Sequence, residues 1–374
     1  MTTPTTPAGA PSAEPTTIEL KPTATPLAAA EREAILANPG FGRHFTDNMV
    51  TVRWTAGRGW HDAQLVPYAP LSIDPASMVL HYSQTIFEGL KAYRQPDGSV
   101  ATFRPYANAA RLNASARRMA MPELPEELFV EACDVLVRQE KAWVPAGGGE
   151  QTLYLRPFMF ATEVGLGVRP SNEYVFMVIA SPSAPFFAGG VKPVTVWLSE
   201  DYVRAVKGGT GAAKTGGNYA ASLAAAAEAA QHGCDQVVWL DAHEHRWVEE
   251  MGGMNLYFVY GDKIVTPELT GSLLPGITRD SLLKIATDLG YEAVEGRIST
   301  EQWKADNESG ALTEVFACGT AAVITPVGSV KSASADWTHG DGAPGEVTLR
   351  LRKALLDLQT GAAPDTHGWM HPLG

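Results

Sequence analysis

The sequence has little of what marks secreted or metal-binding domains. Its 374 residues include only three cysteines, Cys133, Cys234 and Cys318. They are widely spaced and odd in number, so they indicate neither a disulfide framework nor a paired metal site. His243 and His245 have no third ligand at a recognisable spacing, and we predict no bound metal. The cysteine usage favours a reduced, cytoplasmic protein.

Two further absences exclude other classes of protein. No run reaches the about 20 apolar residues of a membrane helix. Residues 1–25, rich in Thr, Pro and Ala, have neither the basic start nor the apolar run of a signal peptide. The formal charge is −12, and Lys and Arg form no cluster of the kind that binds phosphate backbones. We therefore expect small-molecule partners, with no membrane and no nucleic acid.

The order of the remaining patterns predicts two domains in an α/β (α+β) fold. A 45% hydrophobic content is enough for two cores at this length. We expect a disordered tail at 1–25, a smaller α/β domain at 26–184, a connector at 185–191 where the composition changes, and a larger domain at 192–374. Helical periodicity and caps predict helices at 27–37, 107–119, 127–140, 219–232 and 278–289. Apolar runs predict strands at 49–54, 100–104, 152–160, 173–180, 194–198, 236–241, 245–250, 255–260, 263–266, 315–318 and 323–326.

One lysine stands in an unusual run. Residues 207–219 read KGGTGAAKTGGNY, so five glycines surround Lys214. Glycine lets a backbone and a ligand approach each other closely, which leaves room for a flat ligand at this amine.

Three interpretations compete for Lys214. A solvated loop lysine is the commonest case. A phosphate-binding P-loop requires glycine directly before the lysine, and Ala213 stands there instead. A lysine that carries pyridoxal phosphate as a Schiff base would also need an acid for the pyridine nitrogen, a donor for the ring oxygen and a phosphate cup.

Candidates for the acid and the phosphate cup lie in the same half of the chain. Glu249 and Glu250 end a predicted strand, and strand alternation sends them to opposite faces, so only one can face a ring; both could equally be solvated acids at an edge turn. Thr278 is expected to cap the helix 278–289, which makes the amides of Ile277 and Thr278 available to an anion. A second glycine-threonine turn contains Thr320.

These motifs together resemble the branched-chain amino acid aminotransferases, of the fold type IV class of pyridoxal enzymes. The similarity runs from about residue 41 to the C-terminus. It is carried by the segments FTDNM (45–49), FEGLKAY (87–93), LYLRP (153–157), the Lys214 run, EMGGMN (250–255), LPGITR (274–279) and FACGTA (316–321).

The resemblance implies pyridoxal 5'-phosphate as the cofactor, lying between the two domains, and a role for each matching residue. Lys214 would be the catalytic lysine, Glu250 rather than Glu249 the partner of the pyridine nitrogen, and Tyr219 the partner of the ring oxygen. The implied phosphate contacts are Arg111, Ile277, Thr278 and Thr320. The implied substrate contacts are Tyr82, Phe87, Tyr154, Arg156, Val168, Thr320 and Ala321, with Tyr82 and Val168 at positions that serve the other subunit of a homodimer.

The implied reaction is a ping-pong transamination between L-leucine, L-isoleucine or L-valine and 2-oxoglutarate, which yields the branched 2-oxo acid and L-glutamate. D-amino acid aminotransferases and aminodeoxychorismate lyases share the fold type and are the nearest alternatives. A non-catalytic phosphate-ligand-binding protein is the alternative from another class, and it could dispense with Lys214. The cysteine pair that mammalian members of the family carry is replaced by Ala322 and Thr325.

Overall fold

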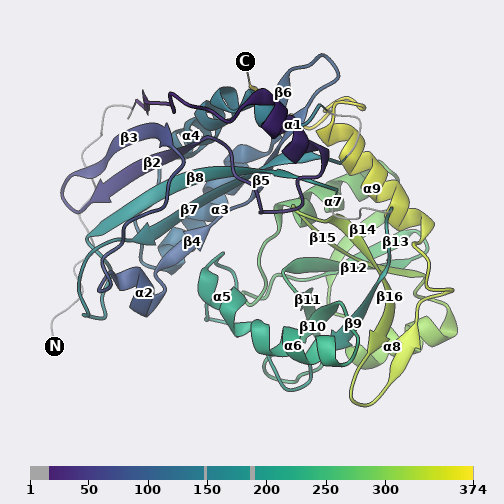
Figure 1. Cartoon of the computed structure of the whole chain (residues 1–374). Helices are drawn as coiled ribbons and strands as arrows, with labels where there is room; N and C mark the ends of the chain where they lie inside the picture. The colour runs from purple at the N-terminus through teal and green to yellow at the C-terminus, as the bar shows by residue number, and fades with distance from the viewer. Residues whose placement is uncertain (1–16, 147–149, 186–189, 374) are drawn as a thin grey trace.

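The computed structural model of the chain describes residues 17–146, 150–185 and 190–373. They form two halves, each built on a large β-sheet with helices packed against it, as the cartoon shows (Figure 1). The predicted connector, 185–191, lies largely outside the described residues. No helix in the described ranges is long and apolar enough to cross a membrane.

The first half is an antiparallel sheet with one parallel edge. Its spatial order is β1, β3, β2, β8, β7, β5, β6, β18, with β4 paired to β7. The strands are β1 (Glu19–Leu20), β2 (Asn48–Thr55), β3 (Gly59–Pro67), β4 (Thr85–Phe87), β5 (Leu90–Arg94), β6 (Val100–Phe103), β7 (Thr152–Ala161), β8 (Glu173–Ser183) and β18 (Met370–Leu373).

The helices of this half are α1 (Ala29–Ala37), α2 (Met78–Tyr82), α3 (Pro105–Arg118) and α4 (Glu126–Gln139), followed by the short 3-10 helix η1 (Lys141–Trp143). Pro105 starts α3, where its fixed φ suits the first helical turn and its missing N–H has no partner to lose. Leu112 on α3 and Phe129 on α4 are buried in the core of the first sheet. Because one face of α3 is packed in this core, the helix is a rigid support for the residues on its other face.

Two expectations for this half are wrong. Glu19 and Leu20 pair with β3, and Ile18 is buried in the core, so the tail expected at 1–25 is ordered from there on. Strand β8 also runs past the end expected at residue 180, because Pro182 and Ser183 still pair with β7.

The second half contains a closed ring of strands. Its order is β11, β10, β9, β16, β15, β12, β13, β14, with β17 paired to β16, and β11 pairs additionally with β12. The strands are β9 (Val194–Leu198), β10 (Gln236–Leu240), β11 (Val248–Met251), β12 (Met254–Tyr260), β13 (Lys263–Pro267), β14 (Glu292–Gly296), β15 (Glu314–Gly319), β16 (Val323–Lys331) and β17 (Asp336–Thr338). The ring leaves β11 without a free edge.

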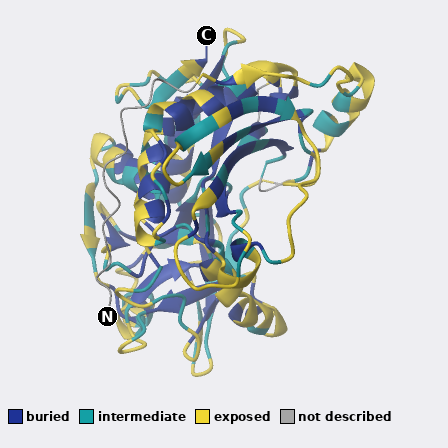
Figure 2. Cartoon of the chain, turned by 90° about the vertical axis from the view of Figure 1, so that its left-hand side faces the viewer, coloured by how far each residue is buried: buried dark blue, intermediate teal, exposed yellow. Residues whose placement is uncertain are grey.

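Helices cover this ring from outside. They are α5 (Gly216–Ala221), α6 (Leu223–Gln231), α7 (Ile277–Asp288), α8 (Thr300–Ser309) and α9 (Glu346–Gln359). Leu282 of α7 and Leu355 of α9 pack with Phe316 of β15 in one core cluster. Figure 2 shows the result as buried sheets under helices and loops with exposed outer faces.

Three sequence expectations differ here. The helix expected at 219–232 is two helices that meet at Ser222, whose hydroxyl donates to the carbonyl of Tyr219 at 2.7 Å. The cap of α7 is Gly276, and Thr278 stands inside the first turn. The strand expected from 245 begins at Val248, because the chain before it bends around the Asp241 carboxylate, which accepts the Arg246 and Trp247 amides.

The end of the chain returns to the first half. Strand β18 pairs with β6, and the Arg104 amide donates to the carbonyl of Trp369 at 2.8 Å. The expected domain of residues 192–374 is therefore wrong for this last strand, which belongs to the first sheet. Strand β18 connects the two halves next to the N-terminus of α3.

Candidate active site

The glycines around Lys214 serve the loop itself as well as any ligand. A Cβ on Gly211 would stand 2.1 Å from the carbonyl oxygen of Ser272, so a larger residue would displace main chain. Gly208 has φ of +82°, a conformation that favours glycine. At Gly217 nothing lies within 4 Å of an added Cβ. Gly211 is thus required by backbone packing, whereas Gly217 is exposed and has free space around it.

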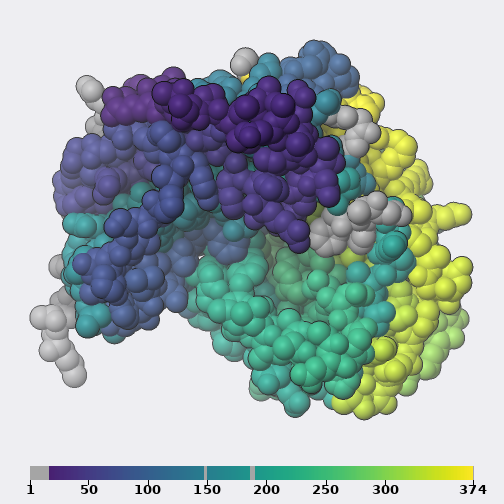
Figure 3. All heavy atoms as spheres, viewed as in Figure 1, coloured from purple at the N-terminus to yellow at the C-terminus, as the bar shows by residue number. Residues whose placement is uncertain are grey.

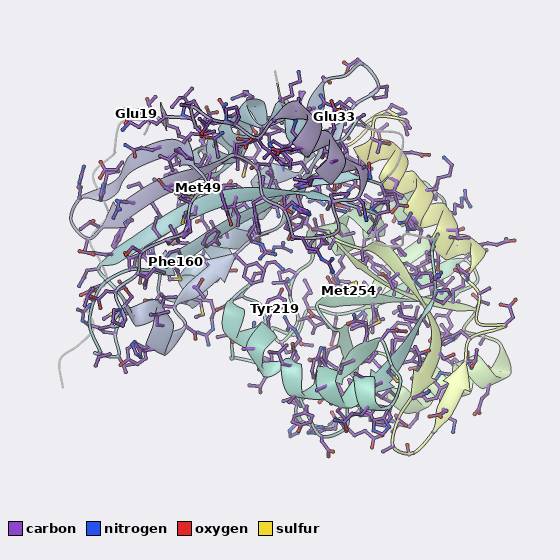
Figure 4. All side chains as sticks on the ribbon, in the orientation of Figure 1. Glu19, Glu33, Met49, Phe160, Tyr219 and Met254 are labelled. Atoms are coloured by element: carbon purple, nitrogen blue, oxygen red, sulfur yellow. The ribbon has the colours of Figure 1, made fainter. Side chains whose placement is uncertain are left out.

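The Lys214 side chain faces an aromatic pair. Its Nζ donates to the Tyr219 hydroxyl at 2.8 Å and lies 4.8 Å from the centre of the Phe87 ring. The Phe87 and Tyr219 rings are themselves 5.0 Å apart. Burial lowers the pKa of Lys214 to about 8, with the positive charge of Arg111 acting in the same direction. Figure 4 labels Tyr219 beside α5, between that helix and Met254 of the second half.

Glu250 is a buried acid with two partners. It lies on β11 and is 2% exposed; Arg204 Nε is 3.0 Å from its Oε2, and the Leu274 amide donates to its Oε1. Burial raises the pKa of Glu250 to about 7, although the charge of Arg204 acts in the opposite direction. A carboxyl with this pKa changes charge near neutral pH.

Its neighbour Glu249 points to a different environment, as strand alternation predicted. Ser272 and Thr270 donate hydroxyl hydrogen bonds to Glu249 Oε1. Both acids are buried, so the interpretation as solvated acids at an edge turn is wrong.

Arg111 projects from α3 toward the start of α7. Its Nε and Nη2 donate to the two carboxylate oxygens of Glu88, at 2.8 and 2.7 Å, and its Nη1 donates to the carbonyl of Pro275 at 3.2 Å. Pro275 comes directly before Gly276, the cap of α7, so Arg111 lies beside the first turn that contains Ile277 and Thr278.

The start of α7 is packed tightly against Asn255 of β12. A Cβ at Gly276 would stand 2.0 Å from Asn255 Oδ1, and Asn255 Nδ2 donates to the carbonyl of Leu274 at 3.1 Å. The first amides of a helix have no partner within the helix, so this turn offers N–H groups to an anion. Thr320 and Ala321 follow β15, which pairs with β12, the strand of Asn255.

Tyr154, Arg156 and Phe87 form one cluster on adjacent strands of the first sheet. The Arg156 guanidinium lies 4.7 Å from the centre of the Phe87 ring, and its Nη2 donates to the Tyr154 hydroxyl at 3.3 Å. Arg156 Nε is buried and has no hydrogen-bond partner among the described residues. Because Phe87 also contacts Lys214, the cluster adjoins the lysine.

Tyr82 and Val168 lie apart from this cluster, on the outer surface of the first half. Val168 is 84% exposed, and the Tyr82 hydroxyl donates to the carbonyl of Leu166. Neither residue has a contact with Lys214 in the part of the chain that the structure describes.

The candidate site residues come from both halves of the molecule. In the space-filling view a hollow separates the blue N-terminal half from the green residues of α5 and α6 (Figure 3). Lys214, Tyr219 and Glu250 come from the second half, whereas Phe87 and Arg111 come from the first.

Comparison with known proteins decides the family. The profile of the class IV amino-transferases matches residues 85–330. The chain belongs to this family. A probable branched-chain-amino-acid aminotransferase of Streptomyces coelicolor is 72% identical over 96% of this class IV chain and 99% of its own length. The branched-chain-amino-acid aminotransferase of Mycolicibacterium smegmatis is 61% identical over 92% and 95%.

Solved structures agree with the fold of this class IV aminotransferase. The T.th. branched-chain amino acid aminotransferase complexed with N-(5'-phosphopyridoxyl)-L-glutamate superposes with a TM-score of 0.71 at 32% identity, over 86% of this chain and 98% of that one. The same enzyme complexed with 4-methylvaleric acid has the same TM-score, identity and coverage. The family and the α/β fold expected from the sequence motifs are confirmed, with membership among the branched-chain enzymes of the class.

Sequence reasoning missed two charged residues of the site. Glu88 was noted only as part of the FEGLKAY segment, although an acid between apolar residues of a buried stretch needs a cation, and Arg111 supplies one. Arg204 is not among the residues that the sequence analysis singles out. The available signal was an arginine just before the lysine loop in sequence, because a buried acid such as Glu250 needs a cationic partner.

Proposed function

We propose that this enzyme moves the amino group between L-leucine, L-isoleucine or L-valine and 2-oxoglutarate, with pyridoxal 5'-phosphate carried on Lys214. The observation that supports this most is the 2.8 Å contact between Lys214 Nζ and the Tyr219 hydroxyl, close to a buried acid. Two ligands in the T.th. enzyme, a phosphopyridoxyl-glutamate and a branched carboxylic acid, match the chemistry of these substrates.

The residues present fit this cofactor. In our account Glu250 holds the pyridine nitrogen and Tyr219 the ring oxygen, and Arg111 binds the phosphate together with Ile277, Thr278 and Thr320. Bound pyridoxal phosphate supplies an electron sink for the substrate α-carbon. The helix N-terminus beside Arg111 suits a phosphate, because unpaired amides and the helix dipole both favour an anion there.

Lys214 is the proton carrier in this account. A general base works best when its pKa lies near the working pH. With a pKa of about 8, Lys214 Nζ is partly neutral near pH 7 and can take a proton, and the Tyr219 hydroxyl and the Phe87 ring fix its position.

The substrate pocket combines apolar walls with a cation. Phe87 and Tyr154 offer aromatic surface to a branched side chain, while Arg156, beside the Phe87 ring, offers a positive charge to the distal carboxylate of glutamate. The amides of Thr320 and Ala321 would bind the α-carboxylate. One pocket thereby accepts both substrates of a ping-pong reaction.

A homodimer is part of the proposal. Leu80, Val164, Leu166 and Val168 are exposed apolar residues close to Tyr82 in the first half. Exposed large apolar residues gathered in one region favour association. We propose that a second copy of this chain covers it, so that Tyr82 and Val168 contribute to the partner's pocket. Sedimentation should show a dimer for the unmodified protein and a monomer for Val168→Asp.

A panel of amino donors with 2-oxoglutarate tests the reaction. We expect glutamate formation from L-leucine, L-isoleucine and L-valine and none from D-alanine. Turnover of D-alanine without turnover of the branched donors would contradict the proposed substrates.

A further inference from the structure

Both backbone groups of Lys214 are bound by the first half of the molecule. The Lys214 amide donates to the Ser115 hydroxyl of α3 at 2.9 Å, and the Lys214 carbonyl accepts from the Phe87 amide at 3.0 Å. Ser115 is fully buried. Lys214 follows the connector in sequence, but its backbone amide and carbonyl are hydrogen-bonded to the first half.

The residues around Lys214 are anchored in the same direction. Thr215 forms an antiparallel bridge with Ile86, and its hydroxyl donates to the carbonyl of Thr85 at 2.7 Å. Arg118 donates from Nε to the carbonyl of Gly209 at 2.8 Å and from Nη2 to that of Gly208 at 3.0 Å. The loop is therefore fastened to α3 and β4 on both sides of the lysine.

The anchoring side chains share one face of α3. Arg111, Ser115 and Arg118 are spaced at i, i+4 and i+7, so they follow one another along a single stripe of the helix. Arg111 is the proposed phosphate ligand, and the opposite face of α3 is packed in the core through Leu112 and Ala116. One rigid helix thus sets both the phosphate arginine and the backbone of the lysine.

Tyr219 and Glu250, in contrast, stand on elements of the second half. The distance from the Lys214 ammonium to these groups therefore depends on how α3 holds the loop. A displacement of about 1 Å in a reacting group can cost about 100-fold in rate.

We propose that Ser115 is a positioning residue for Lys214: its hydroxyl fixes the Lys214 amide and, together with Arg118, sets where the ammonium stands relative to Tyr219. This inference rests on the proposed role of Lys214. Removing the Ser115 hydroxyl leaves the Lys214 amide without its acceptor, so the backbone of the loop is less restrained at Lys214.

Hydrogen exchange tests the anchor directly in the full-length protein, with and without added pyridoxal phosphate. Ser115→Ala should raise the exchange rate of the Lys214 amide ~10-fold or more in both states and lower kcat roughly 10- to 100-fold, with a smaller change in KM. Arg118→Gln, at the exposed C-terminal end of α3, should raise exchange over residues 208–214 and lower kcat in the same sense; this variant carries the test if Ser115→Ala does not fold.

Thr102→Val is the matched control. Thr102 is another fully buried hydroxyl of the first half, and its Oγ1 has no partner within the described residues, so neither exchange at Lys214 nor kcat should change. Unchanged exchange and kcat in both Ser115→Ala and Arg118→Gln would overturn the inference.

Failure of the underlying role of Lys214 has a different signature. If borohydride reduction of the unmodified protein with pyridoxal phosphate labelled no Lys214, the proposed function and this inference would fall together. If Lys214 were labelled and the two variants behaved like Thr102→Val, only the positioning role would fall.

Discussion

Arg204 Nε lies 3.0 Å from Glu250 Oε2, and both side chains are buried. Burial drives the pKa of Glu250 upward to about 7, and the positive charge of the guanidinium opposes that rise. The pair therefore sets the pH at which the proposed partner of the pyridine nitrogen carries its charge.

Replacing Arg204 should move this pH. In Arg204→Met the pKa of Glu250 rises above about 7, because the nearby positive charge that favours the carboxylate is gone. We expect the acid limb of kcat/KM to shift to higher pH, and to shift less in Arg204→Lys, which keeps the charge. If the acid limb of both variants stayed at the pH found for the unmodified protein, Glu250 would not be the group that governs it.

The two neighbouring acids should respond very differently to the same substitution. Glu250→Gln loses the charge proposed to hold the pyridine proton, so kcat should fall roughly 100-fold or more, the scale of removing one preorganised group from a site. Glu249→Gln is the control, because its carboxylate is occupied by Ser272 and Thr270. Steady-state kinetics of the two variants decide the matter; equal losses would remove Glu250 from its special role.

Gly211 should tolerate no side chain. In Gly211→Ala the new Cβ meets the Ser272 carbonyl at 2.1 Å, and we expect about 2 kcal/mol or more of lost stability. In Gly217→Ala the added methyl group meets nothing within 4 Å and sits in α5, so stability should rise by up to about 1 kcal/mol. Urea unfolding of both variants measures the difference, and a destabilised Gly217→Ala with an unaffected Gly211→Ala would contradict the packing.

What the sequence can and cannot indicate about this site depends on whether a feature is local or long-range. Lys214 stands out because its glycine-rich run is local, and the resemblance carried by short motifs points to Tyr219 and Glu250. The partners Glu88 and Arg204 were not, because a buried ion pair depends on which distant strands meet. The break at Ser222 was missed because alanines on either side favour one continuous helix, and the C-terminal strand because pairing between β18 and β6 spans most of the chain.

Acid should weaken the second half through His339. Its Nε2 accepts from Trp303 Nε1 at 3.0 Å, and burial lowers the pKa of His339 from 6.5 to about 4. The unfolded chain binds a proton in that interval and the folded chain does not, so stability present above pH 6.5 is lost as the pH falls toward 4. The loss amounts to as much as about 3 kcal/mol.

His339→Gln isolates this contribution, since an amide can still accept from Trp303 but does not titrate. Urea unfolding at pH 8 and pH 5 should show a smaller difference between the two pH values for the variant than for the unmodified protein. An identical difference in both proteins would show that His339 is not the group responsible.

The central claim is that Lys214 carries the cofactor, and borohydride reduction followed by peptide mass mapping tests it most directly. Lys91 is the internal comparison, because it is also buried, with a pKa lowered by burial to about 8, but it donates to the carbonyl of Ala321. The account predicts a phosphopyridoxyl group on Lys214 and none on Lys91. A label on Lys91, or on neither lysine, would contradict it.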